Sequence, residues 1–150
     1  MDNACFAWAV TAALHPAEKN SERESSYPLY SRVLNLQNIE FPMTLSQIKQ
    51  FEQLNDIFVD VYTIEKQKTS NVLPIRLTDR TIDKKHVNLL YMQDPRDNNV
   101  GHFAWIKDLS RLVSSQLSKK KKTKNTFAID VFTTFVRATS CSLTLWNVER

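Results

Sequence analysis

The segment from Ala4 to Leu14 constrains the fold most, because it is apolar almost all round and rich in alanine. Alanine favours helix, and a helix that is apolar on every side is stable in water only when it is buried. Asp2 or Asn3 is placed to cap the free amides of its first turn, and Pro16 ends it. With 150 residues and 42% hydrophobic content, the chain is long enough for one domain with a core around this helix.

The sequence up to residue 117 then alternates between helical and strand-like patterns. Thr44 to Gln47 forms a Thr-x-x-Gln capping box, and apolar residues at helical spacing predict an amphipathic helix over 45–55. Strands are expected at 57–64 (with Val59 and Val61 on one face), 72–77, 86–92 and 102–107, and a short helix at 109–117. The turn-forming residues 93–99 predict an antiparallel hairpin. The expected fold class is α+β: a buried N-terminal helix and an amphipathic helix packed on an antiparallel sheet.

Two residues lie in local contexts that a thiol-peptidase site requires. Cys5 falls in the first turn of the apolar helix, where the helix dipole favours a thiolate, and Asn3 is placed to donate toward a developing oxyanion. His102 opens a strand directly after Gly101, the single glycine of the chain. That glycine indicates close backbone approach or an uncommon dihedral there. In this interpretation Cys5 is the nucleophile and His102 the general base, in a papain-like order of early helix and late strand.

A second interpretation of the same residues stays open. A cysteine in an alanine-rich helix is also a small hydrophobe, and a histidine at a strand end is also a partly exposed polar residue. His86 is interpreted as a polar residue at a strand edge and not as a second base. The three histidines and two cysteines show no metal-ligand spacing, so neither a metal site nor a cofactor is predicted.

The acid of a catalytic triad is not fixed by the sequence. Asp108 lies six residues after His102, which is about 20 Å along a straight strand. Asp94 and Asp97 in the hairpin turn, and Asn88 on the neighbouring strand, are nearer candidates. Asp94 and Asp108 therefore both remain candidates for the acid.

The net charge of +4 is concentrated in one short stretch of the chain. Outside residues 111–124 the remaining 14 Lys and Arg are fewer than the 16 Asp and Glu. The run Lys119, Lys120, Lys121, Lys122 and Lys124 is interpreted as a solvated basic linker over 119–126, with phosphate contact or nuclear targeting as the alternative. No secretory signal and no apolar window of about 18 residues is present, so an intracellular protein without a membrane partner is expected.

Three blocks of the sequence resemble a known family. They are Asp2–Pro16, Ile39–Asn55 and the pair His86–Tyr91 with His102–Leu112. Together they are similar to the uncharacterised domain that precedes a Cys/His zinc finger and a protein-primed family B DNA polymerase in Polinton/Maverick-type transposon proteins of invertebrates. The resemblance covers about residues 2–118. It implies a papain-like or OTU-like domain over 1–118 in which Cys5 and His102 match the peptidase positions and Asp108 matches a position held by Asp or Asn.

The chain departs from this family at both ends. Relatives carry a long region before the Cys motif, so a truncated copy with a missing edge strand is expected. After Lys124 the expected finger is absent, and residues 127–150 form an irregular tail. A nucleotide sequence that encodes this tail can also encode a Cys-x2-Cys-x12-His-x4-Cys finger in the reading frame that starts two bases further on. The tail is therefore interpreted as a frameshifted zinc finger that folds poorly.

Three functions follow as expectations. The first is a cysteine-peptidase-like thiol hydrolase acting on a peptide. The second is an accessory domain of a DNA-replication protein that contacts DNA through its basic linker. The third is an inactive transposon-derived fragment, which ranks first for this particular chain.

Overall fold

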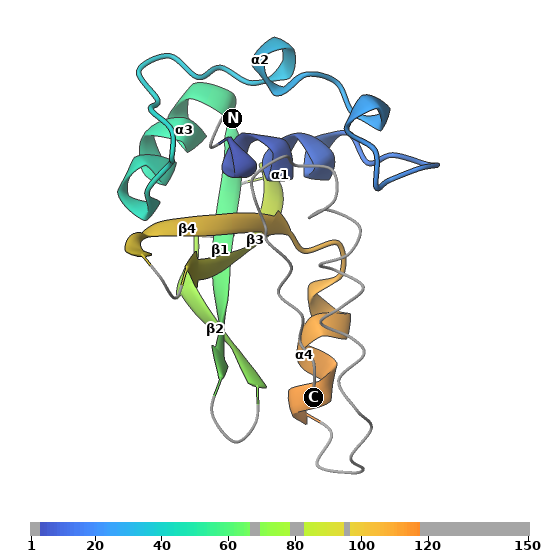
Figure 1. Cartoon of the computed structure of the whole chain (residues 1–150), viewed down its shortest axis with the longest axis vertical. Helices are drawn as coiled ribbons and strands as arrows, with labels where there is room; N and C mark the ends of the chain where they lie inside the picture. Colours follow the sequence, from blue (N-terminus) through green and yellow to red (C-terminus); the bar gives the residue numbers. More distant parts are fainter. Residues whose placement is uncertain (1–3, 67–69, 79–82, 95–96, 118–150) are drawn as a thin grey trace.

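A computed structural model of the chain describes residues 4–66, 70–78, 83–94 and 97–117. They form an α+β fold with one four-stranded sheet and helices on both of its faces (Figure 1). The helices are α1 (Cys5–Leu14), α2 (Tyr30–Val33), α3 (Ile48–Asn55) and α4 (Leu109–Leu117), with the 3-10 turns η1 (Glu24–Ser26) and η2 (Leu45–Gln47). The strands are β1 (Ile57–Lys66), β2 (Ser70–Arg76), β3 (Lys85–Asp94) and β4 (Asp97–Trp105).

The sheet is mixed, which corrects the expected antiparallel sheet. Its order is β2-β1-β3-β4. The β1–β2 and β3–β4 pairs are antiparallel, the latter as the hairpin prediction requires, whereas β1 and β3 run parallel at the centre. The chain leaves β1 for the outer edge, forms β2 there, and returns to the other side of β1. This return makes the central pair parallel.

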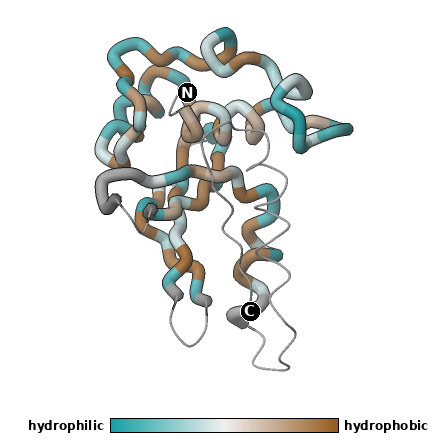
Figure 2. Tube along the Cα trace, in the orientation of Figure 1, coloured by the Kyte–Doolittle hydropathy of each residue, from teal (hydrophilic) through white to brown (hydrophobic). Residues whose placement is uncertain are grey.

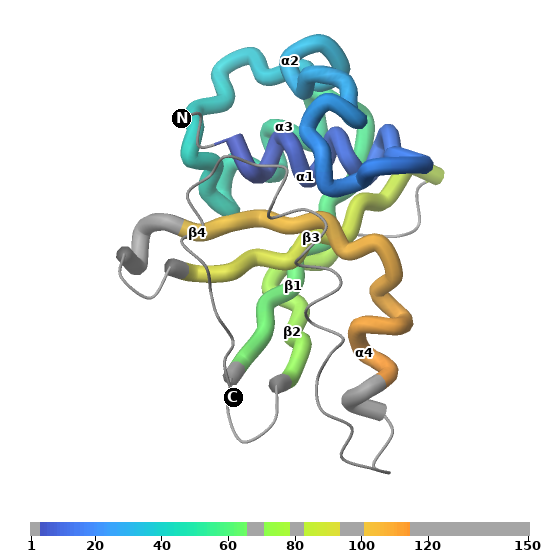
Figure 3. Tube along the Cα trace, turned by 45° about the vertical axis from the view of Figure 1, so that its right-hand side comes forward, coloured from blue at the N-terminus to red at the C-terminus, as the bar shows by residue number. Residues whose placement is uncertain are grey.

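The apolar helix α1 is buried, as its sequence predicts, and Figure 2 shows it in the pale to brown colours of apolar residues. It lies over β3 and β4 on one side, and the segment around α2 covers its other side (Figure 3). Phe6 contacts the ring of Phe51 from α3 and the ring of Phe103 from β4, both edge to face at about 5 Å. Its N-cap is Ala4, which makes no side-chain cap hydrogen bond. The predicted caps Asp2 and Asn3 lie outside the described residues.

The strands alternate between two hydrophobic clusters, one on each face of the sheet. Val59 and Val61 of β1 face α1, as the sequence predicts, together with Leu89 of β3. Tyr62 of β1 and Leu90 of β3 face the opposite side, where α4 lies. We call these the α1 face and the α4 face. Side chains from β1, β3 and β4 thus pack in layers on both faces of the sheet, whereas Leu73 and Ile75 of the outer strand β2 are exposed.

The predicted amphipathic helix is confirmed as η2 followed directly by α3. The capping box at its start is present: Thr44 N donates to Gln47 Oε1 at 3.0 Å. Its acidic residue Glu52 is buried and forms a bidentate ion pair with Arg76 of β2, with N···O distances of 2.6 and 2.8 Å. This pair joins α3 to the outer strand of the sheet.

The hairpin turn is shorter than its composition suggests. The predicted loop at 93–99 is largely strand, because β3 extends to Asp94 and β4 begins at Asp97. The predicted helix at 109–117 is confirmed as α4. The basic linker at 119–126 and the tail at 127–150 lie outside the described residues.

Candidate functional site

The thiol of Cys5 lies at the junction between α1 and β4. Cys5 is the first residue of α1, and its side chain is only 6% exposed. Its Sγ lies 3.9 Å from the backbone oxygen of Gly101 and is in position to donate a weak hydrogen bond to it. The helix N-terminus favours a thiolate at this position, whereas burial against a carbonyl oxygen favours the neutral thiol.

Gly101 provides close approach and not an uncommon backbone conformation. No glycine in the described part of the chain has a positive φ. A Cβ at Gly101 would lie 2.0 Å from Cε2 of Tyr91, the ring that packs across the neighbouring strand β3. The absent side chain therefore leaves room for the Tyr91 ring on the α1 face.

His102 lies next to Gly101 in the chain, but its side chain is on the other face of the sheet. In β4, Phe103 and Trp105 pack in the cluster on the α1 face, whereas Ala104 and Ile106 belong to the cluster on the α4 face. His102 pairs with Met92, which packs on the α4 face as well. Because side chains of a strand alternate with a period of two, the imidazole shares the face of Ala104.

The structure therefore does not bring the predicted nucleophile and base together. Cys5 approaches the sheet from the α1 face, and the imidazole of His102 leaves it toward the α4 face. A general base must be within hydrogen-bond reach of the proton that it removes. In this arrangement the strand backbone separates the two groups.

The other predicted catalytic residues are dispersed. Asp108 is exposed and caps α4, since Arg111 N donates to its Oδ1 at 2.9 Å. Asp94 ends β3 opposite Asp97, and the placement of both side chains lies outside the described residues, as does Asn3. The nucleic-acid candidates Lys119, Lys120, Lys121, Lys122 and Lys124 also lie outside the described residues.

A polar cluster that the sequence interpretation missed lies on the α4 face. Asp60 is fully buried, and its Oδ1 accepts hydrogen bonds of 2.7 Å from both N and Oγ1 of Thr78. Nδ1 of His86 lies 3.7 Å from Asp60 Oδ2. Asn88 is the register partner of Asp60 on β3, and its buried Oδ1 has no hydrogen-bond partner among the described residues. We call Asp60, Thr78, His86 and Asn88 the Asp60 cluster.

The Asp60 cluster corrects the interpretation of His86. His86 is the second residue of β3, which is a central strand, and not a residue at a sheet edge. The signal in the sequence was Asp60 itself, because an aspartate in the middle of an apolar strand must find polar partners when it is buried. Thr78 and His86 are such partners, and Asn88 lies opposite Asp60 on the same face of the sheet.

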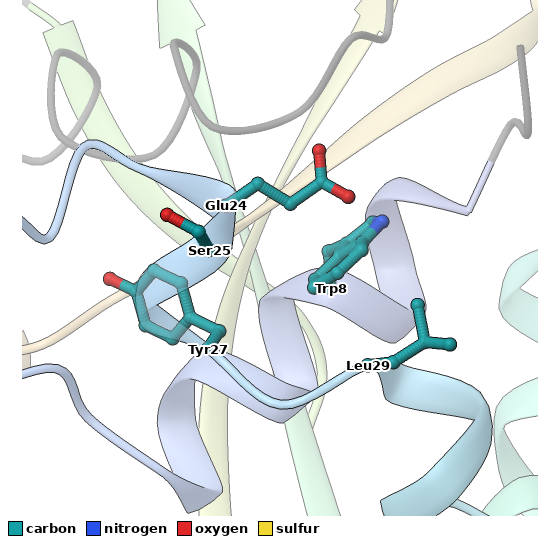
Figure 4. Close-up of a pocket in the computed structure, with 5 residues that line it drawn as sticks. All are labelled: Trp8, Glu24, Ser25, Tyr27 and Leu29. Carbon is teal, nitrogen blue, oxygen red and sulfur yellow. The ribbon is translucent and has the colours of Figure 1, made fainter.

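A shallow open pocket lies beside α1, away from the sheet (Figure 4). Trp8, Tyr27 and Leu29 supply its apolar wall, and Glu24 and Ser25 lie at its rim. Burial, together with the nearby charge of Glu22, raises the pKa of the Tyr27 phenol above its usual value of 10.0.

Comparison with protein-family models, with curated proteins and with solved structures returned no match for this chain. None of the helices formed by the described residues is both long and apolar enough to cross a membrane. Among those residues, no three His, Cys, Asp or Glu side chains gather as a metal-binding group.

Proposed function

We propose that this chain is a transposon-derived domain with a cysteine-peptidase-like layout that does not hydrolyse peptides, and that it serves as an accessory domain of a DNA-replication protein. The link to transposon proteins rests on the resemblance of the blocks Asp2–Pro16, Ile39–Asn55 and the pair His86–Tyr91 with His102–Leu112. The non-catalytic role rests on the position of His102 across the sheet from Cys5. This geometric observation supports the non-catalytic role.

The surroundings of Cys5 support a structural role for its thiol. The residue is nearly inaccessible, and its Sγ lies 3.9 Å from the backbone oxygen of Gly101. A buried cysteine in such surroundings behaves as a small hydrophobe. A catalytic thiol requires partial exposure and an electropositive environment.

A thiol-labelling experiment tests the non-catalytic role. The full chain with Cys141→Ser would be treated at neutral pH with an electrophilic peptide probe for cysteine peptidases. We expect Cys5 to label no faster than the thiol of a small peptide, and the rate to be the same in His102→Ala. Rapid labelling of Cys5 that His102→Ala abolishes would instead establish the peptidase role, with Asp94 or Asp108 as the acid to be tested next.

A salt titration tests the contact with DNA, which the proposal assigns to the run from Lys119 to Lys124. Each phosphate contact contributes about −0.9 to the slope of log K against log salt. We expect binding of a short duplex to weaken steeply with salt, and to be lost when Lys119, Lys120, Lys121 and Lys122 are all changed to Gln. A matched control removes four exposed charges elsewhere: Lys19, Lys49, Lys107 and Arg32. Equal loss of binding in both variants would show that binding depends only on the net charge of the chain. It would contradict the assignment of DNA contact to the run from Lys119 to Lys124.

A further inference from the structure

The open pocket beside α1 presents apolar and aromatic side chains to solvent (Figure 4). Its walls are Trp8, Tyr27 and Leu29. Leu29 is 45% exposed and is one of five large apolar side chains that the described part of the chain exposes. A hollow with apolar walls and a few polar groups at its rim is the usual form of a ligand site.

The indole of Trp8 is held in place by its neighbours and still borders the pocket. Only 7% of the residue is exposed. The ring of Tyr30 packs against the indole at 82°, with 5.2 Å between the ring centroids. Tyr30 does not line the pocket, so the indole meets the pocket with a part that Tyr30 does not cover. Tryptophan is also the aromatic side chain that attracts cations most strongly.

The carboxylate of Glu24 supplies the charge at this pocket. Figure 4 shows it extending from η1 toward the indole of Trp8. Glu24 is exposed, and no ion pair holds its side chain within the described part of the chain. The hydroxyl of Tyr27 already donates to Ser21 O at 2.8 Å. The residues that line the pocket thus combine an aromatic wall with one negative charge and no basic group.

We propose that this pocket binds an arginine side chain of a partner polypeptide. A guanidinium group stacks on aromatic rings, pairs with carboxylates and is more weakly hydrated than the ammonium group of lysine. It would contact Trp8 and pair with Glu24, and an apolar residue next to the arginine would pack against Leu29. The site uses neither Cys5 nor the run from Lys119 to Lys124. It therefore goes beyond the accessory role proposed above and can be tested independently of it.

An NMR titration of the full chain with the peptide acetyl-Leu-Arg-Leu-amide tests the site through the indole N–H signal of Trp8. Trp105→Phe and Trp146→Phe assign this signal among the three tryptophans of the chain. We expect saturable shifts of the Trp8 signal with a dissociation constant of about 1 mM. A peptide with neutral citrulline in place of arginine should bind at least about fivefold more weakly. The lysine analogue should also bind more weakly than the arginine peptide.

Glu24→Gln should weaken binding of the arginine peptide about threefold, as expected for an exposed ion pair, and should leave binding of the citrulline peptide unchanged. The matched control is Glu18→Gln, which removes another exposed carboxylate that does not line the pocket. It should leave both affinities unchanged, and circular dichroism would verify that each variant is folded. The proposal is overturned if the arginine peptide leaves the Trp8 signal unmoved or if the citrulline or lysine peptide binds as tightly. Equal weakening by Glu18→Gln and Glu24→Gln would overturn it as well.

Discussion

At the scale of single residues, the contact between Gly101 and Tyr91 determines how closely β3 and β4 pack beneath α1. A Cβ on residue 101 would lie 2.0–2.3 Å from three atoms of the tyrosine ring. We predict that Gly101→Ala lowers the free energy of unfolding by about 1–3 kcal/mol, the usual cost of overpacking a well-filled region. Urea denaturation measures this loss.

The control for that prediction removes the ring that the new methyl group meets. Tyr91→Ala alone should destabilise the fold through lost packing. The double variant Gly101→Ala with Tyr91→Ala should lose less stability than the sum of the two single variants, because the clash no longer exists. Additive losses would show that Gly101 is needed for a reason other than the tyrosine ring.

The phenol of Tyr27 gives the fold a dependence on alkaline pH. Burial and the charge of Glu22 raise the pKa of Tyr27 in the folded state above its ordinary value of 10.0. A raised pKa means that the folded state holds the proton more tightly than the unfolded state. Its stabilising effect is therefore complete below about pH 10 and is lost as the pH rises through the folded-state pKa.

We predict that Tyr27→Phe makes the free energy of unfolding less dependent on pH above 10. The variant also loses the hydrogen bond from Tyr27 Oη to Ser21 O, so its stability at pH 7 should fall slightly. Chemical denaturation between pH 8 and pH 11 separates the two effects. If the unfolding free energy of Tyr27→Phe depends on pH above 10 as steeply as that of the unchanged chain, groups other than Tyr27 cause this dependence.

At the scale of elements, the ion pair of Glu52 and Arg76 holds α3 against the hairpin of β1 and β2. Glu52 Oε1 also accepts a 2.8 Å hydrogen bond from Val59 N, so its carboxylate connects a helix and both strands. We predict that Glu52→Gln costs about 3 kcal/mol of unfolding free energy, since Arg76 would keep a poorly compensated charge in a mostly buried position. Urea denaturation again provides the measurement.

Two comparisons sharpen this prediction. The double variant Glu52→Leu with Arg76→Leu should cost less than Glu52→Leu alone, because no single charge stays behind. The exposed pair of Glu22 and Arg23 serves as the surface reference, and Glu22→Gln should change stability by less than about 0.5 kcal/mol. Equal costs for Glu22→Gln and Glu52→Gln would show that burial does not strengthen the inner pair.

The elements themselves were predictable where the local pattern is strong. The alanine-rich run predicted α1, the Thr44–Gln47 box predicted the start of the second helix, and the α4 range was predicted as observed. The parallel pairing of β1 with β3 was not predictable. It depends on the position of β2 at the outer edge, which is a long-range outcome that no local spacing encodes.

The face of the sheet on which the His102 side chain lies was not predictable from the sequence, for a related physical reason. The four residues after it, Phe103 to Ile106, are all apolar, because both faces of β4 are covered. A strand with one exposed face shows its inward side by alternation, whereas a doubly covered strand does not. Cys5 lies beside the strand that holds His102, but the sequence contained no signal for the face on which the imidazole lies.

At the scale of the whole molecule, the described members of the two hydrophobic clusters lie within residues 4–112. The α1 face holds the larger cluster, and α4 closes the other face through Leu112, which is 8% exposed. We predict that a chain of residues 1–117 unfolds cooperatively, with a free energy within about 0.5 kcal/mol of that of residues 1–150. This follows if residues 127–150 are translated in a shifted frame and were never selected to support the fold.

Leu112→Ala in both chains provides the reference for that comparison. It removes a buried side chain from the α4 face and should cost about 2–3 kcal/mol in each chain. Thermal and urea denaturation of the four proteins measure the set. A shortened chain that loses cooperative unfolding would mean that residues 118–150 complete the core, and the frameshift interpretation would then be wrong. If the two chains are equally stable, the domain over residues 1–117 is sufficient to hold Cys5, His102 and the Asp60 cluster in place, and the chemistry of each can be tested on it directly.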